Sequence, residues 1–251
     1  MKFRLTALGL HLLASGIVLT LIFGALYLGW YRWPGWYLAD VSQVVLVMVG
    51  ADVVLGPLLT FVVAGPSKPR RALTRDIGMI VAIQLFALAY GTMSIWNGRP
   101  LYYAFSENVL QAVQAYDIDP GELTLARQQK AEFAPNWYSL PRWIWAPLPQ
   151  DPHERERIVA SAIAGGDDVI SMPRLFRPWN QGLSALRSQL KKVDEVGYFS
   201  AADKKVLKEH MRAAGLPTDQ PNSIPLTGRG HPLLAVFDPA ALKITAIFKA
   251  R

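Results

Sequence analysis

The sequence predicts a membrane protein in which a three-helix transmembrane bundle is followed by an extracytoplasmic α+β domain. Three apolar runs lie within the first 97 of 251 residues, at 5–28, 41–64 and 76–96. As helices, at about 1.5 Å per residue, such runs are long enough to cross a hydrocarbon core about 30 Å thick. After Asn97 the pattern becomes that of a water-soluble domain of about 150 residues, enough for one core. We therefore predict a three-span domain over residues 1–97 and an α+β domain over residues 98–251.

Composition narrows the possible functions. The chain has no cysteine, which excludes disulfides, thiol nucleophiles and thiolate metal sites. Its net charge is +7, but 7 of its 26 basic residues precede Asn97, and the part after Asn97 has a net charge of only +3. This basic excess is not gathered in one segment, which argues against nucleic-acid binding.

The first apolar run is interpreted as a membrane span and not as a cleavable signal peptide. A signal peptide has an apolar region of about 7 to 15 residues that ends at small residues. Here aromatic residues follow instead: Trp30, Tyr31, Trp33, Trp36 and Tyr37. Aromatic side chains gather at membrane–water interfaces, and Pro34 with Gly35 predicts a short turn into the second span.

Basic residues predict the orientation of the spans. On the N-terminal side of the membrane lie Lys2, Arg4, Lys68, Arg70, Arg71 and Arg75, whereas the opposite short loop has Arg32. By the positive-inside rule, the N-terminus and the loop at 67–76 are cytoplasmic. Because three spans place the two chain ends on opposite sides, the α+β domain is expected outside the cytoplasm.

The central run carries one carboxylic acid, Asp52. An acid at this depth is costly in lipid, so it should face other helices and find a partner there, or remain protonated. Gly56 and Thr60 follow at steps of four residues and share one helix face with it. Small and polar residues on one face let another helix approach closely. Pro57 leaves the carbonyl of Val53 without its usual donor, which predicts a kink beside the acid.

Polar residues of all three spans occur at matched depths. Counted from the cytoplasmic interface at about 1.5 Å per residue, the depths are roughly 6–9 Å for Thr60 and His11, 11 Å for Gln84, 15 Å for Ser15 and 18–20 Å for Asp52 and Tyr90. We predict an intramembrane polar cluster of these side chains. In it Asp52 forms hydrogen bonds, with Ser15 and Tyr90 as the nearest candidates and with Gln84 and His11 toward the cytoplasm.

Catalytic and metal chemistry are not predicted for these residues. An intramembrane aspartyl protease needs a second acid at hydrocarbon depth, and Asp76 lies at the interface. We therefore favour a packing or helix-recognition role for Asp52. His11 stands alone in the spans, since His153, His210 and His231 lie outside them, so no metal cluster is expected. No cofactor site is recognised.

The α+β domain is expected to begin with strands at 101–105 and 109–118, although the second also has helical spacing. Capping residues, glycines and prolines predict helices at 120–133, 152–165, 181–196 and 200–214. The chain should end in a hairpin of strands 233–237 and 243–248. The sequence TGRGH at 227–231 is interpreted as a turn before this hairpin.

An aromatic segment at 136–149 is the candidate partner patch of this domain. It contains Trp137, Tyr138, Arg142, Trp143 and Trp145 together with three prolines. We favour a loop whose rings fill the core or touch the membrane surface. The alternative is a partner-binding patch, in which Arg142 could stack or pair with an acidic partner.

Several segments together resemble a known family. They are LTALGLHLLASG, the aromatic turn WYRWPGWY, GADVVLGPLLTFVV, NGRPLYYAF and the closing GRGHPLLAVFD. This layout resembles the type IV pilin accessory proteins of bacteria with retractile pili. The resemblance implies an inner-membrane protein with a periplasmic C-terminal domain whose partners are the bilayer and the major type IV pilin. It implies a protein that binds or modulates the pilin and aids pilus assembly or dynamics, and it supplies no catalytic residues. The sequence leaves open the oligomeric state and the choice among pilin stability, assembly and retraction.

A pilin partner also agrees with the physical pattern, because an unassembled pilin has one apolar helix in the membrane and a head outside. The Asp52, Gly56 and Thr60 face either braces the bundle or receives the client helix. The rival functions are a membrane-anchored periplasmic enzyme and a small transporter subunit. An enzyme predicts a pocket with convergent titratable groups, whereas a transporter predicts internal symmetry or paired broken helices.

Overall fold

The computed structural model describes residues 1–65 and 68–250. Its contacts group the chain into two compact units. The transmembrane unit comprises Met1–Arg32 and Asp40–Gly98, and the α+β domain comprises Trp33–Ala39 and Arg99–Arg251. The short turn between the first two spans, which the sequence places in the three-span domain, thus packs with the α+β domain.

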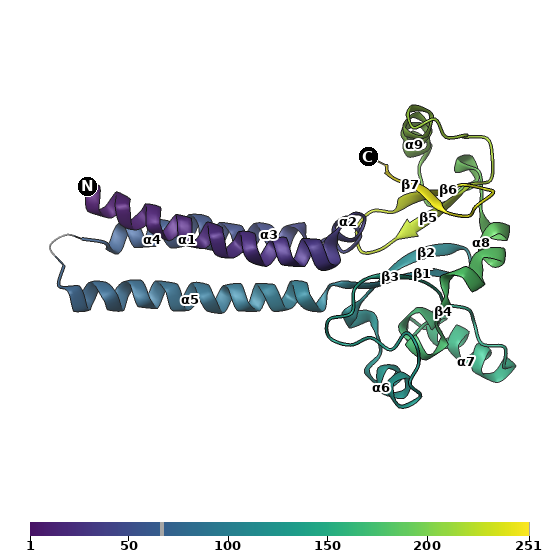
Figure 1. Ribbon diagram of the computed structural model, residues 1–251, viewed down its shortest axis with the longest axis horizontal. Helices are drawn as coiled ribbons and strands as arrows, with labels where there is room; N and C mark the ends of the chain where they lie inside the picture. The colour runs from purple at the N-terminus through teal and green to yellow at the C-terminus, as the bar shows by residue number, and fades with distance from the viewer. Residues whose placement is uncertain (66–67, 251) are drawn as a thin grey trace. The chain divides into compact units, whose positions relative to one another are not determined.

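Three long helical segments make up the transmembrane unit (Figure 1). The first is α1 (Lys2–Leu26), which continues into the π-helical turn η1 (Tyr27–Tyr31). The second consists of α3 (Ser42–Val49), η2 (Gly50–Leu55) and α4 (Gly56–Val63). The third is α5 (Arg70–Asn97). All three are long and apolar enough to cross a membrane, which confirms the predicted spans.

The loop predicted at 67–76 is shorter than expected. Because α5 begins at Arg70, the basic residues Arg70, Arg71 and Arg75 lie in its first turns, where no proline or glycine interrupts the helix. Ser67, the first residue of the predicted loop, lies outside the described residues.

The irregularity predicted beside Asp52 is a π-helical turn. It covers Gly50–Leu55 and is followed directly by α4, in which Pro57 occupies the first turn. A proline has no N–H to donate to the carbonyl four residues earlier, and a wider π turn is a common way to accommodate such a break. Asp52 therefore lies within the least regular part of the second span.

The second span is the centre of the transmembrane unit, because α1 and α5 both pack against it. Near the end of α5, the Tyr31 hydroxyl donates a hydrogen bond of 2.5 Å to the carbonyl of Ile95. Close by, the Trp30 and Trp96 rings meet edge to face at 4.8 Å. An aromatic junction thus joins the first and third spans at this level.

A seven-stranded mixed sheet forms the α+β domain, in the order β4-β3-β1-β2-β5-β6-β7. Its strands are β1 (Pro100–Ser106), β2 (Val109–Gln114), β3 (Arg142–Trp145), β4 (Arg177–Pro178), β5 (Ser223–Thr227), β6 (Leu233–Phe237) and β7 (Ile244–Lys249). The neighbouring pairs β1–β3 and β2–β5 are parallel and the others are antiparallel. This sheet and its helices confirm the predicted α+β class, and β6 with β7 confirms the closing hairpin.

The helices of this domain are α2 (Gly35–Leu38), α6 (Pro120–Gln128), α7 (Pro152–Ile163), α8 (Leu183–Gln189) and α9 (Ala201–Ala213). Short 3-10 turns lie between them: η3 (Ala115–Asp117), η4 (Val169–Ser171), η5 (Pro173–Leu175), η6 (Trp179–Gly182) and η7 (Val193–Glu195). The starts of α6, α7 and α9 are capped by Asp119, Asp151 and Ser200, as the sequence predicts.

Four predicted elements of this domain differ from the structure. The strand at 109–118 ends at Gln114, and the helix at 120–133 ends at Gln128, near Lys130 with its φ of 51°. The helix at 181–196 stops at Gln189, because the backbone of Lys191 exchanges hydrogen bonds of 2.8 and 3.0 Å with Ser223. The loop at 136–149 contains β3, which extends the sheet beside β1.

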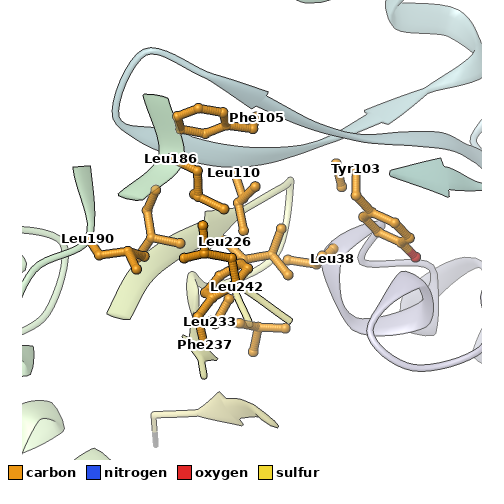
Figure 2. Packing of buried hydrophobic residues seen from close by; sticks show 13 residues of the cluster. Leu38, Tyr103, Phe105, Leu110, Leu186, Leu190, Leu226, Leu233, Phe237 and Leu242 are labelled. Carbon is orange, nitrogen blue, oxygen red and sulfur yellow. The ribbon is translucent and has the colours of Figure 1, made fainter. Parts of the chain in front are cut away.

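The main core of the domain lies against one face of the sheet. Its members alternate along the strands, as in Tyr103 and Phe105 of β1. Figure 2 shows Leu38 entering this cluster from α2 beside Leu226 and Leu233. Leu38 is fully buried there. Two further clusters use the intervening strand residues, one with Ile158 of α7 and one with Leu207 of α9.

Candidate functional site

The first polar contact of the transmembrane unit joins α1 to α4. His11 Nδ1 and Thr60 Oγ1 form a hydrogen bond of 2.6 Å, and Thr60 is 2% exposed. Nearer the N-terminus, Arg4 Nε donates a hydrogen bond of 2.8 Å to the carbonyl of Ala64. These bonds fix the register of α1 along α4, because hydrogen bonds are strong guides to helix pairing in an apolar medium.

The second polar contact joins the π-helical turn to α5. Gln84 Nε2 donates to Asp52 Oδ1 at 3.3 Å and approaches the backbone carbonyl of the same residue at 3.5 Å. The Gln84 side chain lies directly on Gly56, so a Cβ at position 56 would overlap it. Gly56 thus permits the close approach of α5 that places an amide beside the buried acid.

These two contacts form the base of a groove of about 430 Å³ within the transmembrane unit. One wall is a face of α1 with Ala7, Leu10, Ala14, Ser15 and Val18; the other is a face of α5 with Ile77, Val81, Leu85 and Leu88; the base carries His11, Asp52, Thr60 and Gln84. The groove therefore combines apolar walls with a polar base at mid-depth.

The polar base keeps unused hydrogen-bonding capacity. Gln84 Oε1 is buried and accepts no hydrogen bond from the residues that the structure describes. Ser15 lies in the wall of the same groove. An unsatisfied polar atom in hydrocarbon is costly, so this site is suited to a hydrogen-bonding group from outside the chain.

The structure does not bring Tyr90 into the predicted cluster. Its side chain is 75% exposed and lies at a second hollow that also involves Gln43, Met48 and Gly91. The helix face of α5 that is buried runs through Leu88, Gly91 and Ile95. Tyr90 lies six residues beyond Gln84, about 240° around the helix, and equal depth therefore does not bring it to Asp52.

The aromatic segment of the α+β domain divides into two parts. Trp143 and Trp145 belong to β3; the Trp143 ring lies 4.7 Å from Tyr103 and 5.6 Å from Trp179, and Trp145 packs over Gly182. Trp137 and Tyr138 are 69% and 63% exposed, and Arg142 is also exposed. Two of the four large rings thus belong to the core, and the turn at 137–138 faces outward.

Residues 227–231, interpreted from the sequence as a simple turn, hold the segment Trp33–Ala39. The amides of Arg229 and Gly230 donate to the carbonyl of Leu38 at 2.7 and 3.1 Å. A Cβ at Gly228 or Gly230 would overlap the backbone of residues 37–38. The two glycines around Arg229 were the available signal, since such a close backbone approach requires glycine. We call residues 227–231 the glycine clasp.

A polar cleft of about 270 Å³ lies beside the glycine clasp. Its charged residues include Asp117, Asp168 and Arg229. Asp117 Oδ2 accepts from the Gln114 amide at 2.8 Å, Asp168 Oδ1 accepts from the Val169 amide at 2.6 Å, and Arg229 lies 4.1 Å from the centre of the Tyr116 ring. Asp117 and Asp168 thus stabilise local turns through these hydrogen bonds.

Among the residues that the structure describes, no three His, Asp or Glu side chains gather as metal ligands.

Comparisons with known proteins assign a family. No family model and no solved structure matches the chain. Curated relatives from Dichelobacter nodosus do match. The fimbrial assembly protein of serogroup I is 28% identical over 186 residues, 73% of this chain and 70% of the relative. That of serogroup E1 is 26% identical over 222 residues, 87% and 84%. That of serogroups C1 and C2 is 32% identical over 118 residues, 47% of this chain and 90% of the relative.

The chain belongs to the family of these fimbrial assembly proteins. Its structure has three apolar helices, a polar groove among them and an α+β domain of mixed sheet. The groove with Asp52 at its base is the candidate functional site.

Proposed function

We propose that this protein is an inner-membrane accessory protein that binds a type IV pilin and promotes fimbrial assembly. Its relatives are named fimbrial assembly proteins, and the motifs quoted above resemble type IV pilin accessory proteins. The proposed orientation places the N-terminus in the cytoplasm and the α+β domain in the periplasm, in agreement with the distribution of basic residues.

The groove between α1 and α5 is the observation that carries this proposal. Its apolar walls fit the side chains of one transmembrane helix, and its base is lined by Asp52 and Gln84. Gln84 covers Gly56, and Thr60 bonds to His11 at the base of the groove, so we assign both residues to packing between the spans. The client helix is assigned to the open groove beside them.

A docked helix would be stabilised in two ways. Packing against both walls supplies dispersion contacts, which drive helix association in lipid. A polar side chain of the client at the level of Asp52 would satisfy the base of the groove, where an interhelical hydrogen bond contributes about 0.6 to 2 kcal/mol. A hydrogen bond of this strength breaks readily, so the contact is reversible. Reversible contact suits a protein that passes a pilin subunit onward.

Site-specific photocrosslinking tests the proposal in cells that express the major pilin. A photoreactive residue at Leu10 or Leu85, on the two groove walls, should form an adduct with pilin. Leu21 of α1 and Phe86 of α5 are matched controls: they are 68% and 77% exposed, compared with 64% and 58% for the test sites, and do not line the groove. Adducts at the controls alone, or no pilin adduct at the wall positions, would contradict the proposal.

A further inference from the structure

A surface turn of the α+β domain exposes three large apolar side chains within four residues. Trp137, Tyr138 and Leu140 are 69%, 63% and 54% exposed. A clustered set of exposed apolar side chains marks a contact surface more often than single ones do. The rings of Trp143 and Trp145 pack against the core. The outward position is therefore a property of this turn and not of the whole aromatic segment.

The turn is ordered by its own hydrogen bonds. Asn136 Oδ1 accepts from the Tyr138 amide at 3.2 Å and from Ser139 Oγ at 3.0 Å. The backbone N–H of Asn136 in turn donates to Ser139 Oγ at 3.0 Å. The apolar side chains are therefore held outward before any contact forms, which reduces the entropy lost when they bind a surface.

Two arginines hold the turn from the domain side. Arg99 Nη2 donates to the carbonyl of Trp137 at 2.8 Å, and Arg127 Nη2 donates to the carbonyl of Pro135 at 3.1 Å. Arg99 is buried, whereas the Arg127 side chain carries its charge at the surface of the domain. Lys130 and Arg142 lie close by in the sequence and add further positive charge. Between positions 127 and 142 the sequence has one acidic residue, Glu132. The apolar turn thus has a positively charged surround.

The turn is hydrogen-bonded to a residue that comes directly after a span in the sequence. Arg99 follows α5 by two positions, since α5 ends at Asn97. Two residues of extended chain reach at most about 7 Å. The Trp137 carbonyl is therefore tethered, through a single side chain and a short length of backbone, to the end of a membrane-spanning helix.

From these observations we infer that residues 136–140 enter the interfacial layer of the bilayer and that the surrounding basic residues bind anionic lipid headgroups. Tryptophan and tyrosine are the residue types that favour this layer, because their rings are apolar and their polar edges remain hydrated. Each Lys or Arg near an anionic surface contributes about 1 kcal/mol. This surface is separate from the groove and would orient the α+β domain on the membrane whether or not a client is bound.

The absence of cysteine from the chain makes a direct test straightforward. A single cysteine replaces Tyr138 in the full-length protein and is labelled with an environment-sensitive fluorophore. A matched variant carries the label at Tyr198, a tyrosine of the same domain that is 54% exposed. Both are reconstituted in vesicles of phosphatidylcholine and phosphatidylglycerol, with and without lipids that carry a doxyl quencher near the headgroup.

The expected result is a blue-shifted emission at position 138 that is quenched by the doxyl lipids and protected from aqueous iodide. Position 198 should show iodide quenching and little lipid quenching. Replacing phosphatidylglycerol by phosphatidylcholine should weaken the lipid quenching at position 138. The double variant Arg127→Gln and Arg142→Gln should reduce that dependence on phosphatidylglycerol.

Three results would overturn the inference. The first is equal accessibility of positions 138 and 198 to iodide, without lipid quenching at 138. The second is equal lipid quenching at both positions, because the contact would then not belong to this turn. The third is a spectral change at position 138 that requires purified pilin and not lipid, which would assign the turn to a protein partner. Because Tyr138 is exposed, its replacement should leave the urea midpoint of the domain unchanged, and this measurement serves as the folding control.

Discussion

Glu122 in the α+β domain and Asp52 in the transmembrane unit are both buried carboxyl groups, but their surroundings differ. Glu122 Oε2 lies 2.6 Å from Arg174 Nε, and Glu122 Oε1 accepts a second bond of 3.3 Å from the same guanidinium. Arg174 also reaches Glu154 at 2.7 Å. Asp52, by contrast, accepts from the neutral amide of Gln84 at 3.3 Å.

This difference separates a structural site from a site with remaining binding capacity. A bidentate arginine saturates the geometry of its carboxylate partner and links α6, α7 and η5 into one piece. Gln84 leaves its own Oε1 without a donor in the described chain, and the groove exposes this region to a further helix. The α+β domain therefore balances its buried acid internally, whereas the transmembrane unit keeps a polar atom without a donor among the described residues.

The largest expected effect on stability is that of Glu122→Ala. It leaves the Arg174 side chain, which is 13% exposed, with Glu154 as its remaining acidic partner, and removal of one partner of a buried pair costs about 3 to 5 kcal/mol. Urea unfolding of the full-length protein in micelles, followed by tryptophan fluorescence, measures this change. Glu154→Gln is the matched control: its side chain is 29% exposed, so its effect should be clearly smaller. Equal midpoints for both variants would contradict the structural role of Glu122.

The next effect is expected for Gly230→Ala in the glycine clasp. The added Cβ overlaps the backbone carbonyl of Tyr37, so the clasp must open and Leu38 must leave its buried position. Loss of a buried leucine contact costs about 2 to 5 kcal/mol, of which relaxation should recover part, and we expect about 2 to 3 kcal/mol. The same urea experiment applies. Gly197→Ala, where nothing lies within 4 Å of the added atom, should be nearly neutral; a neutral Gly230→Ala would show that the clasp does not hold α2.

The three spans and most of the secondary structure could be predicted from local signals. Apolar runs determine the spans, and the caps Asp119, Asp151 and Ser200 determine three helix starts. One error in the predicted secondary structure arose where backbone groups from a distant part of the chain form hydrogen bonds. Lys191 ends α8 because Ser223 offers it a strand-like pair, although the apolar period of Leu186, Leu190 and Val193 continues and all three are buried. Periodicity reports burial and not the backbone conformation that achieves it.

Part of the candidate site could be predicted from the sequence. Depth counting placed Gln84 and His11 among the polar residues of the bundle, but depth carries no information on helix rotation. For this reason it favoured Tyr90, which is exposed and lies at a different hollow from Asp52. The packing of the aromatic turn Trp33–Ala39 with the α+β domain could not be predicted, because no local signal links Leu38 to residues 189 or more positions later.

A smaller effect, below about 1 kcal/mol, is expected for Asp117→Asn in the polar cleft. Burial raises the pKa of the Asp117 carboxyl above its usual value, although the Gln114 amide and Arg229 act in the opposite direction. The folded state thus holds this proton more tightly than the unfolded state. Stability should therefore fall as pH rises from the unfolded pKa, about 3.9, through the folded one. Asparagine should abolish this part of the pH dependence of the urea midpoint; an unchanged slope in the variant would assign the effect to other groups.

The smallest effect on stability is expected for Asp52→Asn, although it should reduce fimbrial assembly. Asparagine can still accept from Gln84, and the packing of Gln84 on Gly56 is unchanged, so we expect a change below about 1 kcal/mol, in the range of single interhelical hydrogen bonds in membranes. What is lost is the acidic group offered to the client. Counting surface fimbriae and measuring the protein's abundance in the same cells separates the two effects. Asp52→Leu should reduce assembly further. A loss of abundance equal to the loss of fimbriae would make Asp52 a structural residue like Glu122, and normal fimbriation in the leucine variant would remove the acid from the client site.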